Sequence, residues 1–398
     1  MEQYSNLTQE LTKSIDKATK KRDGIFITPK NIIETMGKSI NKYMKNVNTI
    51  LEPSCGSCEI INYFDTKYKS KKIVGIELND TIYDKIKDLK FNNDTRLLHM
   101  DYLTYNNDEQ YDLIIGNPPY FVMPKNKVDK QYYSLFDGRP NIFVIFLIHS
   151  LPKLAKNGIL CFILPKNFLN CLYYDKLRNL INKNYTILNI HDTSSEKFID
   201  TQQDTMIFTI QNKKPKSNNK WVMEKQGYTI FNDNISILQS YYEGSTLLDT
   251  MGFHVKVGNI VWNQVKDKLT SDSSKTLLVY SGNIKDNKLQ IQNFSNEEKK
   301  QYINVKGKMG PTLIVNRGYG NGEYKFNYAI INPKQEYLCE NHIICIVPKN
   351  EMEPNTLMAN YEKITNSFEN EKTKEFIKYY FANNGINTVE LQTVLPIY

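Results

Sequence analysis

Residues 111–120 are Tyr111-Asp112-Leu113-Ile114-Ile115-Gly116-Asn117-Pro118-Pro119-Tyr120, a short apolar run that leads directly into a tetrapeptide with two prolines. A short run that is mostly apolar is typical of a strand buried on both faces of a sheet. The two prolines fix φ and stiffen the segment after the run. The stretch therefore predicts a buried strand with a rigid loop at its carboxyl end.

Six more apolar runs surround this one, and helix-length segments connect many of them. The seven runs are residues 47–51, 72–76, 97–100, 111–115, 159–164, 185–190 and 204–210. Such runs predict a parallel sheet with helices on both faces, and right-handed crossovers give it a doubly wound arrangement. We expect this α/β domain within residues 1–240. Short strands and frequent turns predict a second, mixed α+β domain over residues 241–398.

A helix is predicted to begin at Thr28-Pro29, with Thr28 as the N-cap and Pro29 at the first helical position. Apolar side chains recur at helical spacing behind it, at Ile32, Ile33, Met36 and Ile40. The preceding residues, 1–22, are polar and lysine-rich, and we expect them to be helical.

The charge balance favours an anionic partner. Lys+Arg is 51 and Asp+Glu is 43, which gives a net charge of +8 and excludes an acidic solvating protein. No apolar run approaches the length of a membrane span, and the first residues lack the apolar core of a secretory signal. Six cysteines do not form a disulfide scaffold, so we expect an intracellular protein without a metal site.

Polar side chains follow four of the predicted strands. They are Glu52, Glu77, Asp101 and Asn117. Carboxyl ends of parallel strands share one edge of a sheet, so we expect these groups to form a site. Glu77 lies 21 residues after Gly56, a spacing typical of a carboxylate that binds a ribose. The turn lacks a triple-glycine pyrophosphate loop, so an acidic lining favours a nucleoside with a positive sulfonium, S-adenosylmethionine, over NAD or ATP.

The tetrapeptide at residues 117–120 suits one chemical task. The side-chain oxygen of Asn117 and the carbonyl of Pro118 can accept both hydrogens of one planar amino group. Those bonds favour a pyramidal nitrogen whose lone pair can act as a nucleophile. Tyr120 offers a flat face on which a base could stack. A simple proline turn with a packed tyrosine is the alternative interpretation.

In combination, these motifs resemble the gamma class of DNA adenine-N6 methyltransferases, in particular type II restriction-modification methylases of the Thermus TCGA kind. The matching stretches are residues 25–29, 51–56, 74–77, 100–103 and 117–120. The resemblance implies a seven-stranded Rossmann-like catalytic domain and a C-terminal target-recognition domain. It also implies that the cofactor contacts Thr28, Glu52, Ser54, Glu77, Asp101, Tyr102 and Asn117.

The same resemblance implies that Phe198 packs against a flipped base opposite Tyr120. Its implied partner is double-stranded DNA, and a cognate restriction endonuclease would act on the same site. We expect a monomer.

In the second domain, a glycine-rich loop contains Arg317, Tyr319 and Asn321, which are candidates for reading bases. The alternative interpretation is a surface hairpin.

Two other functions remain open at this stage. The Asn-Pro-Pro-Tyr loop also occurs in enzymes that methylate glutamine in release factors, and related enzymes methylate RNA adenine. The glutamine enzymes carry a small helical domain before the catalytic domain, whereas here residues 241–398 follow it, which favours DNA. A catalytically inert DNA-binding module would not need Asn117, Asp101 and Glu77 together.

Overall fold

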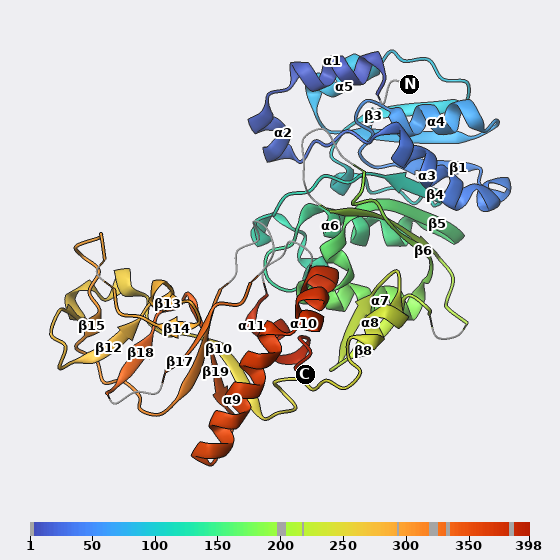
Figure 1. The fold of residues 1–398 in the computed structure, drawn as a ribbon. Coiled ribbons are helices and arrows are strands. Elements are labelled where there is room, and N and C mark those ends of the chain that lie inside the picture. Colours follow the sequence, from blue (N-terminus) through green and yellow to red (C-terminus); the bar gives the residue numbers. More distant parts are fainter. Residues whose placement is uncertain are drawn as a thin grey trace. The chain divides into compact units, whose positions relative to one another are not determined.

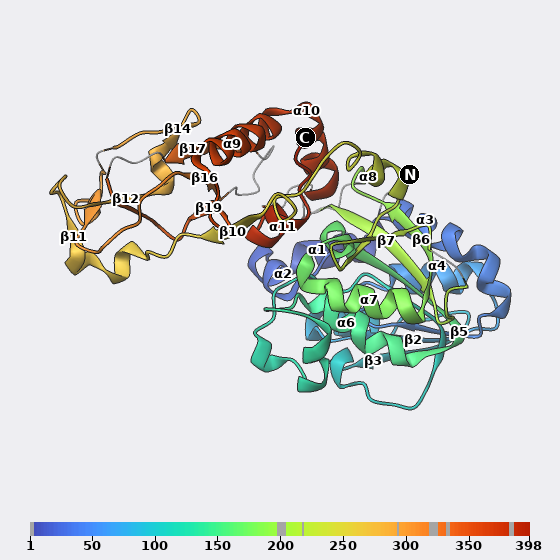
Figure 2. The ribbon, with the colours of Figure 1, turned by 90° about the horizontal axis from the view of Figure 1, so that it is seen from below.

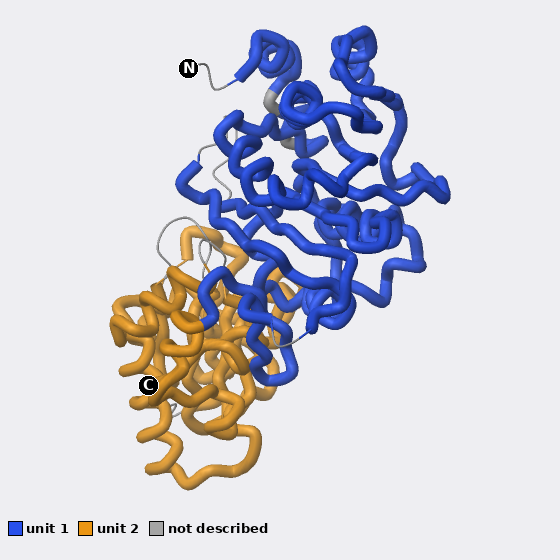
Figure 3. Tube along the Cα trace, turned by 90° about the vertical axis from the view of Figure 1, so that its right-hand side faces the viewer, with its two compact units in different colours: residues 1–235 blue, residues 236–398 orange. Residues whose placement is uncertain are grey.

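The computed structural model describes residues 4–196, 204–216, 219–292, 294–317, 325–331, 335–381 and 386–398. The chain divides into two compact units, residues 1–235 and 236–398 (Figure 3). The division predicted from the sequence lies between residues 240 and 241. Each unit has its own sheets and its own buried core.

The first unit is built on a seven-stranded sheet with the order β3-β2-β1-β4-β5-β7-β6 (Figure 1). Its strands are β1 (Thr49–Glu52), β2 (Lys72–Glu77), β3 (Asp94–His99), β4 (Tyr111–Gly116), β5 (Leu154–Pro165), β6 (Thr186–Asp192) and β7 (Thr205–Gln211). Each predicted apolar run overlaps one of these strands, so the doubly wound α/β fold is confirmed. The order changes direction between β1 and β4, the place where such sheets bind ligands.

The prediction of a parallel sheet is wrong for one strand. β7 runs antiparallel to both of its neighbours, β5 and β6. Residues 193–204 separate β6 from β7 along the chain. An apolar run does not tell a parallel strand from an antiparallel one, so the sequence pattern does not predict this reversal.

Helices cover both faces of this sheet, and alternate strand residues feed two separate cores. In β4, Ile114 faces one core while Leu113 and Ile115 face the other. The first core contains α6 (Ile142–Ser150) and α7 (Asp175–Asn184). The second contains α1 (Asn6–Ser14), α3 (Lys30–Ile40), α4 (Glu59–Lys67) and α5 (Asp80–Ile86). Figure 2 shows α6 and α7 over the sheet.

Helix α6 explains the longest apolar run of the chain. All nine of its residues are buried, so it needs no polar face. Because it lies within the first core, this run belongs to the interior of the unit. No helix in the described part of the chain combines the length and the apolar character needed to cross a bilayer.

Residues 6–23 contain two short helices, as we expected for the polar N-terminal segment. The side chain of Ser5 caps α1, and that of Asp16 caps α2 (Lys17–Asp23) by accepting from two main-chain N–H groups. Gly24 ends α2 with φ at +65°. A Cβ at Gly24 would lie 2.6 Å from the main-chain nitrogen of Tyr120, so glycine is required both by the backbone angle and by this close approach.

The second unit is a mixed α+β structure, as predicted. One sheet has the order β10-β19-β16-β17, with β10 (Phe253–Val257), β19 (Ile343–Pro348), β16 (Thr312–Asn316) and β17 (Tyr328–Ile331). A second sheet has the order β11-β15-β12-β18, with β11 (Leu269–Thr270), β15 (Tyr302–Ile303), β12 (Thr276–Val279) and β18 (Tyr337–Cys339). Its helices are α9 (Pro354–Glu369), α10 (Glu371–Phe376) and α11 (Thr388–Thr393).

The remaining elements are short. Two hairpins pair β8 (Val222–Lys225) with β9 (Tyr228–Phe231), and β13 (Ile284–Lys285) with β14 (Lys288–Leu289). Helix α8 (Ile235–Ser240) lies where the chain passes from the first unit to the second.

Candidate active site

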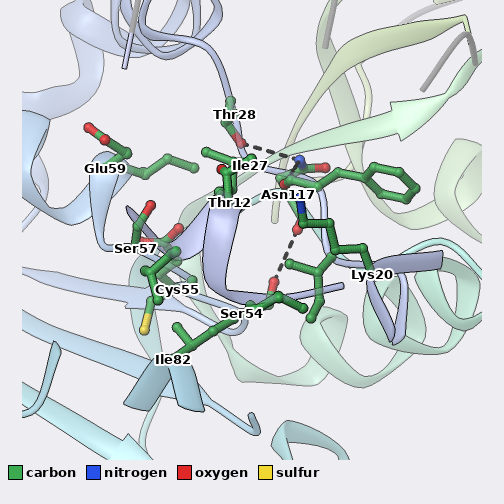
Figure 4. A pocket seen from close by; sticks show the side chains of 17 residues that line it. Thr12, Lys20, Ile27, Thr28, Ser54, Cys55, Ser57, Glu59, Ile82 and Asn117 are labelled. Atoms are coloured by element: carbon green, nitrogen blue, oxygen red, sulfur yellow. Dashed lines mark hydrogen bonds between the residues drawn. The ribbon is translucent and has the colours of Figure 1, made fainter. Parts of the chain in front are cut away.

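The tetrapeptide at residues 117–120 follows β4 directly, and its asparagine is fixed by hydrogen bonds. The amide nitrogen of Asn117 donates to the carbonyl of Phe26 at 3.1 Å and to Oγ1 of Thr28 at 3.2 Å. The hydroxyl of Ser54 donates to the main-chain oxygen of Asn117 at 3.1 Å (Figure 4). Because a carbonyl can only accept, the Phe26 contact assigns the nitrogen of the amide to this side and its oxygen to the other.

Tyr120 holds the oxygen side of the same amide. Its hydroxyl lies 2.6 Å from Oδ1 of Asn117 and 2.8 Å from the carbonyl oxygen of Ile163. The ring stacks on Phe26 at a centroid distance of 5.8 Å and meets the edge of Phe143. Burial raises the pKa of Tyr120 well above its ordinary value, so the phenol stays protonated. The side chain therefore braces Asn117 within the unit.

Two oxygen atoms of the tetrapeptide can each accept a further hydrogen bond. In the described part of the chain, no donor bonds the carbonyl oxygen of Pro118. The Oδ1 atom of Asn117 meets a single donor, Tyr120, and a carbonyl oxygen has two lone pairs. Two acceptor positions therefore remain, on neighbouring residues, as the predicted chemistry requires.

A pocket lies beside this tetrapeptide, with an empty volume of about 740 Å³ that includes open solvent at its mouth. It brings together four residues predicted to bind a cofactor, which are Thr28, Glu52, Ser54 and Asn117. Residues of α1, α2, α4 and α5 complete the wall. The pocket thus adjoins the carboxyl ends of β1 and β4, at the change of direction in the sheet.

Glu52 places a buried carboxyl group in this pocket. Its side chain is 2% exposed, and its Oε2 atom has no hydrogen-bond partner among the described residues. Burial raises the pKa of its carboxyl well above the ordinary value. An unsatisfied buried carboxylate is costly, and a bound ammonium group would remove that cost. The residue therefore fits the amino group of a methionine-like ligand.

Glu77 and Asp101 do not line the pocket, although both stand at the predicted strand ends. The carboxylate of Glu77 accepts from the N–H of Gly56 at 2.9 Å and from that of Asn79 at 2.8 Å. Burial raises the pKa of Glu77. Asp101 accepts from the N–H of Leu103 at 2.9 Å. Through Gly56, Glu77 holds the turn that forms part of the pocket wall.

Two predictions need correction. The N-cap of α3 is Pro29 and not Thr28, because the Thr28 hydroxyl accepts from Asn117 instead of from the helix. The side chain of Tyr102 does not reach the pocket. It is 1% exposed and belongs to the first core, where its hydroxyl bonds Ser150 at 2.8 Å. Any cofactor contact of Tyr102 would have to come from its main chain.

Several residues of the site were not found from the sequence. Lys20, Gly24 and Thr12 belong to a polar segment in which no motif marks them as site residues. The Phe26 carbonyl is a main-chain group, and a sequence pattern does not predict its contact with Asn117. Of the other predicted residues, Arg317 is exposed just beyond β16. Phe198, Tyr319 and Asn321 lie outside the described residues.

The chain is similar in sequence to known methylases. A family model described as Eco57I restriction-modification methylase matches residues 56–199. The type II methyltransferase M.CvrRI of Paramecium bursaria Chlorella virus XZ-6E is 26% identical over 392 residues, which are 97% of each chain. The modification methylase CviBIII of Paramecium bursaria Chlorella virus NC1A is 28% identical and covers 100% of both chains.

In sequence, the chain is similar to type II restriction-modification methylases. The solved structure of the DrdV–DNA complex matches this structure with a TM-score of 0.53 and 12% sequence identity. The match includes 95% of this chain and 57% of the DrdV chain, and at this identity it shows a similar fold alone. The seven-stranded sheet with its antiparallel β7 is that of class I S-adenosylmethionine-dependent methyltransferases. For a methylase with this fold, S-adenosylmethionine is the methyl donor, and the buried carboxylate of Glu52 fits its amino group.

Proposed function

We propose that the chain methylates the N6 atom of adenine in double-stranded DNA. The observation that carries the proposal is the fixed amide of Asn117 beside the pocket, with an open carbonyl oxygen at Pro118. The whole-length similarity to type II methylases supports DNA as the substrate. The bound cofactor would supply an electrophilic methyl group on its sulfonium.

Adenine N6 lies inside the duplex, so the base must first rotate out, at a cost of a few kcal/mol. Asn117 and Pro118 would accept the two hydrogens of the amino group and so free its lone pair for attack on the methyl group that a bound cofactor would supply. The transfer would form a nitrogen–carbon bond and break the carbon–sulfur bond, and the extra proton on N6 would pass to water. Positioning supplies most of the rate.

Tyr120 has two tasks in this proposal. Its hydroxyl keeps Oδ1 of Asn117 in place, as its 2.6 Å contact supports. Its ring, braced by Phe26 and Phe143, would form one wall for the flipped base, with Phe198 opposite. We further propose that residues 241–398 recognise the target sequence, with Arg317, Tyr319 and Asn321 reading bases.

The test compares acceptors with tritium-labelled S-adenosylmethionine. Duplex DNA, RNA and release-factor protein are each offered to the purified chain, and the DNA is then digested and its nucleosides separated. We expect label in N6-methyladenine from duplex DNA. Label in cytosine, in RNA or in protein would replace the proposed substrate by that acceptor. Absence of label from every acceptor would indicate an inert module.

A further inference from the structure

The loop that follows the tetrapeptide carries an exposed apolar side chain and four exposed cations. It comprises residues 121–141 and leads from the tetrapeptide after β4 to α6 (Figure 1). We propose that Val122 enters the DNA duplex and fills the gap left by the flipped adenine, while Lys127 and Lys130 bind neighbouring phosphates. This inference rests on the proposed function for the substrate. It assigns a part of the DNA-binding surface to the first unit.

Main-chain hydrogen bonds close this loop at its base. The N–H of Met123 donates to the carbonyl of Pro140 at 2.9 Å. The N–H of Ile142 donates to the carbonyl of Phe121 at 2.8 Å. These two bonds flank Val122, which lies in an antiparallel bridge between the two ends of the loop. The backbone therefore fixes the place of Val122 relative to the tetrapeptide.

Buried side chains hold the rest of the loop. Val128 and Phe136 belong to the first core. The hydroxyl of Tyr132 lies 2.7 Å from Nδ1 of the buried His149. The loop is thus preorganised, and a preorganised surface loses little further conformational freedom when it binds DNA.

Val122 is the exposed apolar residue at the fixed base of the loop. Its side chain is 57% exposed, whereas its neighbours Phe121 and Met123 pack against the first core. It lies two residues after Tyr120, so their Cα atoms are at most about 7 Å apart. In the proposed function Tyr120 forms one wall for the flipped base. An apolar side chain so close to that wall is placed to act as a wedge in the base stack.

The charges of the loop suit a polyanion. Its four cations are all exposed, and they are Lys125, Lys127, Lys130 and Arg139. In the described part of the chain, none of the four pairs with a carboxylate. The two carboxylates of the loop have other partners. Asp129 accepts from the N–H of Gln131 at 3.0 Å. Asp137 pairs with Lys176 at 2.6 Å.

We assign the phosphate contacts to Lys127 and Lys130. They flank Val128, whose burial fixes this part of the loop. Lys125, in contrast, lies over the ring of Tyr133 at 4.8 Å. Lysine binds phosphate as a point charge, so it holds the DNA backbone without reading a base. The loop would thus add contacts that do not depend on the base sequence.

Single-turnover methylation of two duplexes, at saturating S-adenosylmethionine, tests the role of Val122. Both duplexes carry the sequence around the adenine that the tritium assay identifies. The adenine faces thymine in one duplex and an abasic site in the other, where it is unpaired. We expect Val122→Ala to lower the rate on the paired duplex about 10-fold, because it removes two methyl groups of apolar contact. On the abasic duplex, where no base pair has to open, the rate should stay within about threefold of the wild type.

Two variants serve as controls for Val122→Ala. Val122→Ile keeps the apolar wedge and should retain the rate on both duplexes. Val389→Ala truncates a valine of α11 that is 43% exposed, and it should also leave both rates unchanged. Because the loop does not line the pocket, every variant should bind S-adenosylmethionine as the wild type does, which shows that the preparations are folded.

The salt dependence of binding to the paired duplex tests the two lysines. Each lost phosphate contact lowers the slope of log affinity against log salt by about 0.9, so Lys127→Met combined with Lys130→Met should lower it by about 1.8. Lys69→Met is the control, since it removes an exposed lysine that precedes the amino end of β2. The site lies at the carboxyl ends of the strands, so this variant should keep the wild-type slope.

Three results would overturn the proposal. Equal losses on the paired and abasic duplexes would mean that Val122 acts within the site and not in the base stack. An unchanged rate for Val122→Ala would remove the side chain from the duplex, and an unchanged salt slope would remove the lysines from the phosphates. The proposed function fails separately, if the tritium assay finds no N6-methyladenine in duplex DNA treated with the wild type.

Discussion

Gly24→Ala tests how the N-terminal segment supports the tetrapeptide. The new methyl group would lie 2.6 Å from the main-chain nitrogen of Tyr120 and 3.1 Å from Cβ of Pro119. Its backbone would also have to keep φ at +65°. The left-handed conformation costs about 1–2 kcal/mol with a side chain, and overpacking against a backbone costs about 1–3 kcal/mol. The free energy of unfolding should therefore fall by about 2–5 kcal/mol.

The matched control is Gly227→Ala in the β8–β9 hairpin. Gly227 has φ at +79°, but a Cβ there would meet no atom within 4 Å. This variant should lose only the conformational part, about 1–2 kcal/mol. Urea denaturation gives the loss in the free energy of unfolding for each variant, provided that the dependence on urea concentration is the same for both. The difference between the two losses is the cost of the contact with Tyr120 and Pro119.

The same contact predicts a catalytic effect. A shift of the tetrapeptide by about 1 Å can lower the rate about 100-fold, so Gly24→Ala should lower kcat even under conditions where it is fully folded. Gly227→Ala should leave kcat unchanged. If the two variants were equally stable and equally active, the close approach would not position the tetrapeptide, and this reasoning would be refuted.

Two further predictions concern Tyr120 and Glu52. Tyr120→Phe removes the hydroxyl that donates to Oδ1 of Asn117. The loss of one hydrogen bond should lower the single-turnover rate about 3- to 10-fold and leave the affinity for the cofactor unchanged. An unchanged rate would show that the hydroxyl does not hold the amide. Burial raises the folded-state pKa of Glu52 well above its ordinary value of about 4.5, so protonation stabilises the folded state. This contribution is lost as the pH rises from about 4.5 through the raised pKa. The free energy of unfolding of Glu52→Gln, measured by denaturation at several pH values, should therefore exceed that of the wild type by more as the pH rises. The affinity of the wild type for the cofactor should rise as Glu52 ionises, and that of the variant should not.

The sequence predicts the sheet well because most of its strands carry a buried apolar run. Residues 113–115 of β4 and 159–164 of β5 are such runs, and the polar residues after the strands mark the edge where ligands bind. The reversal of β7 is not visible in the same pattern, because an apolar run carries no direction. The structure shows it in the antiparallel pairing of β7 with β5 and β6.

The site is only partly predictable for a related reason. Asn117 and Glu52 stand in motifs, whereas Lys20 and Thr8 look like ordinary polar residues of an amphipathic helix. Thr8 is buried against the loop after β1, where its hydroxyl bonds that of Ser57, and Lys20 is buried at the pocket wall. Tyr102 shows the opposite case, since its place beside Asp101 suggested a cofactor contact, but its side chain points into the core.

The central claim is that the amide of Asn117 activates an amino group of the substrate. Single-turnover methylation of duplex DNA by Asn117→Ala, at saturating S-adenosylmethionine, tests it most directly. The account predicts a rate at least about 10³-fold below that of the wild type, with the affinity for the cofactor retained. A variant that transfers the methyl group at the wild-type rate, or that loses only its affinity for the cofactor, would contradict it.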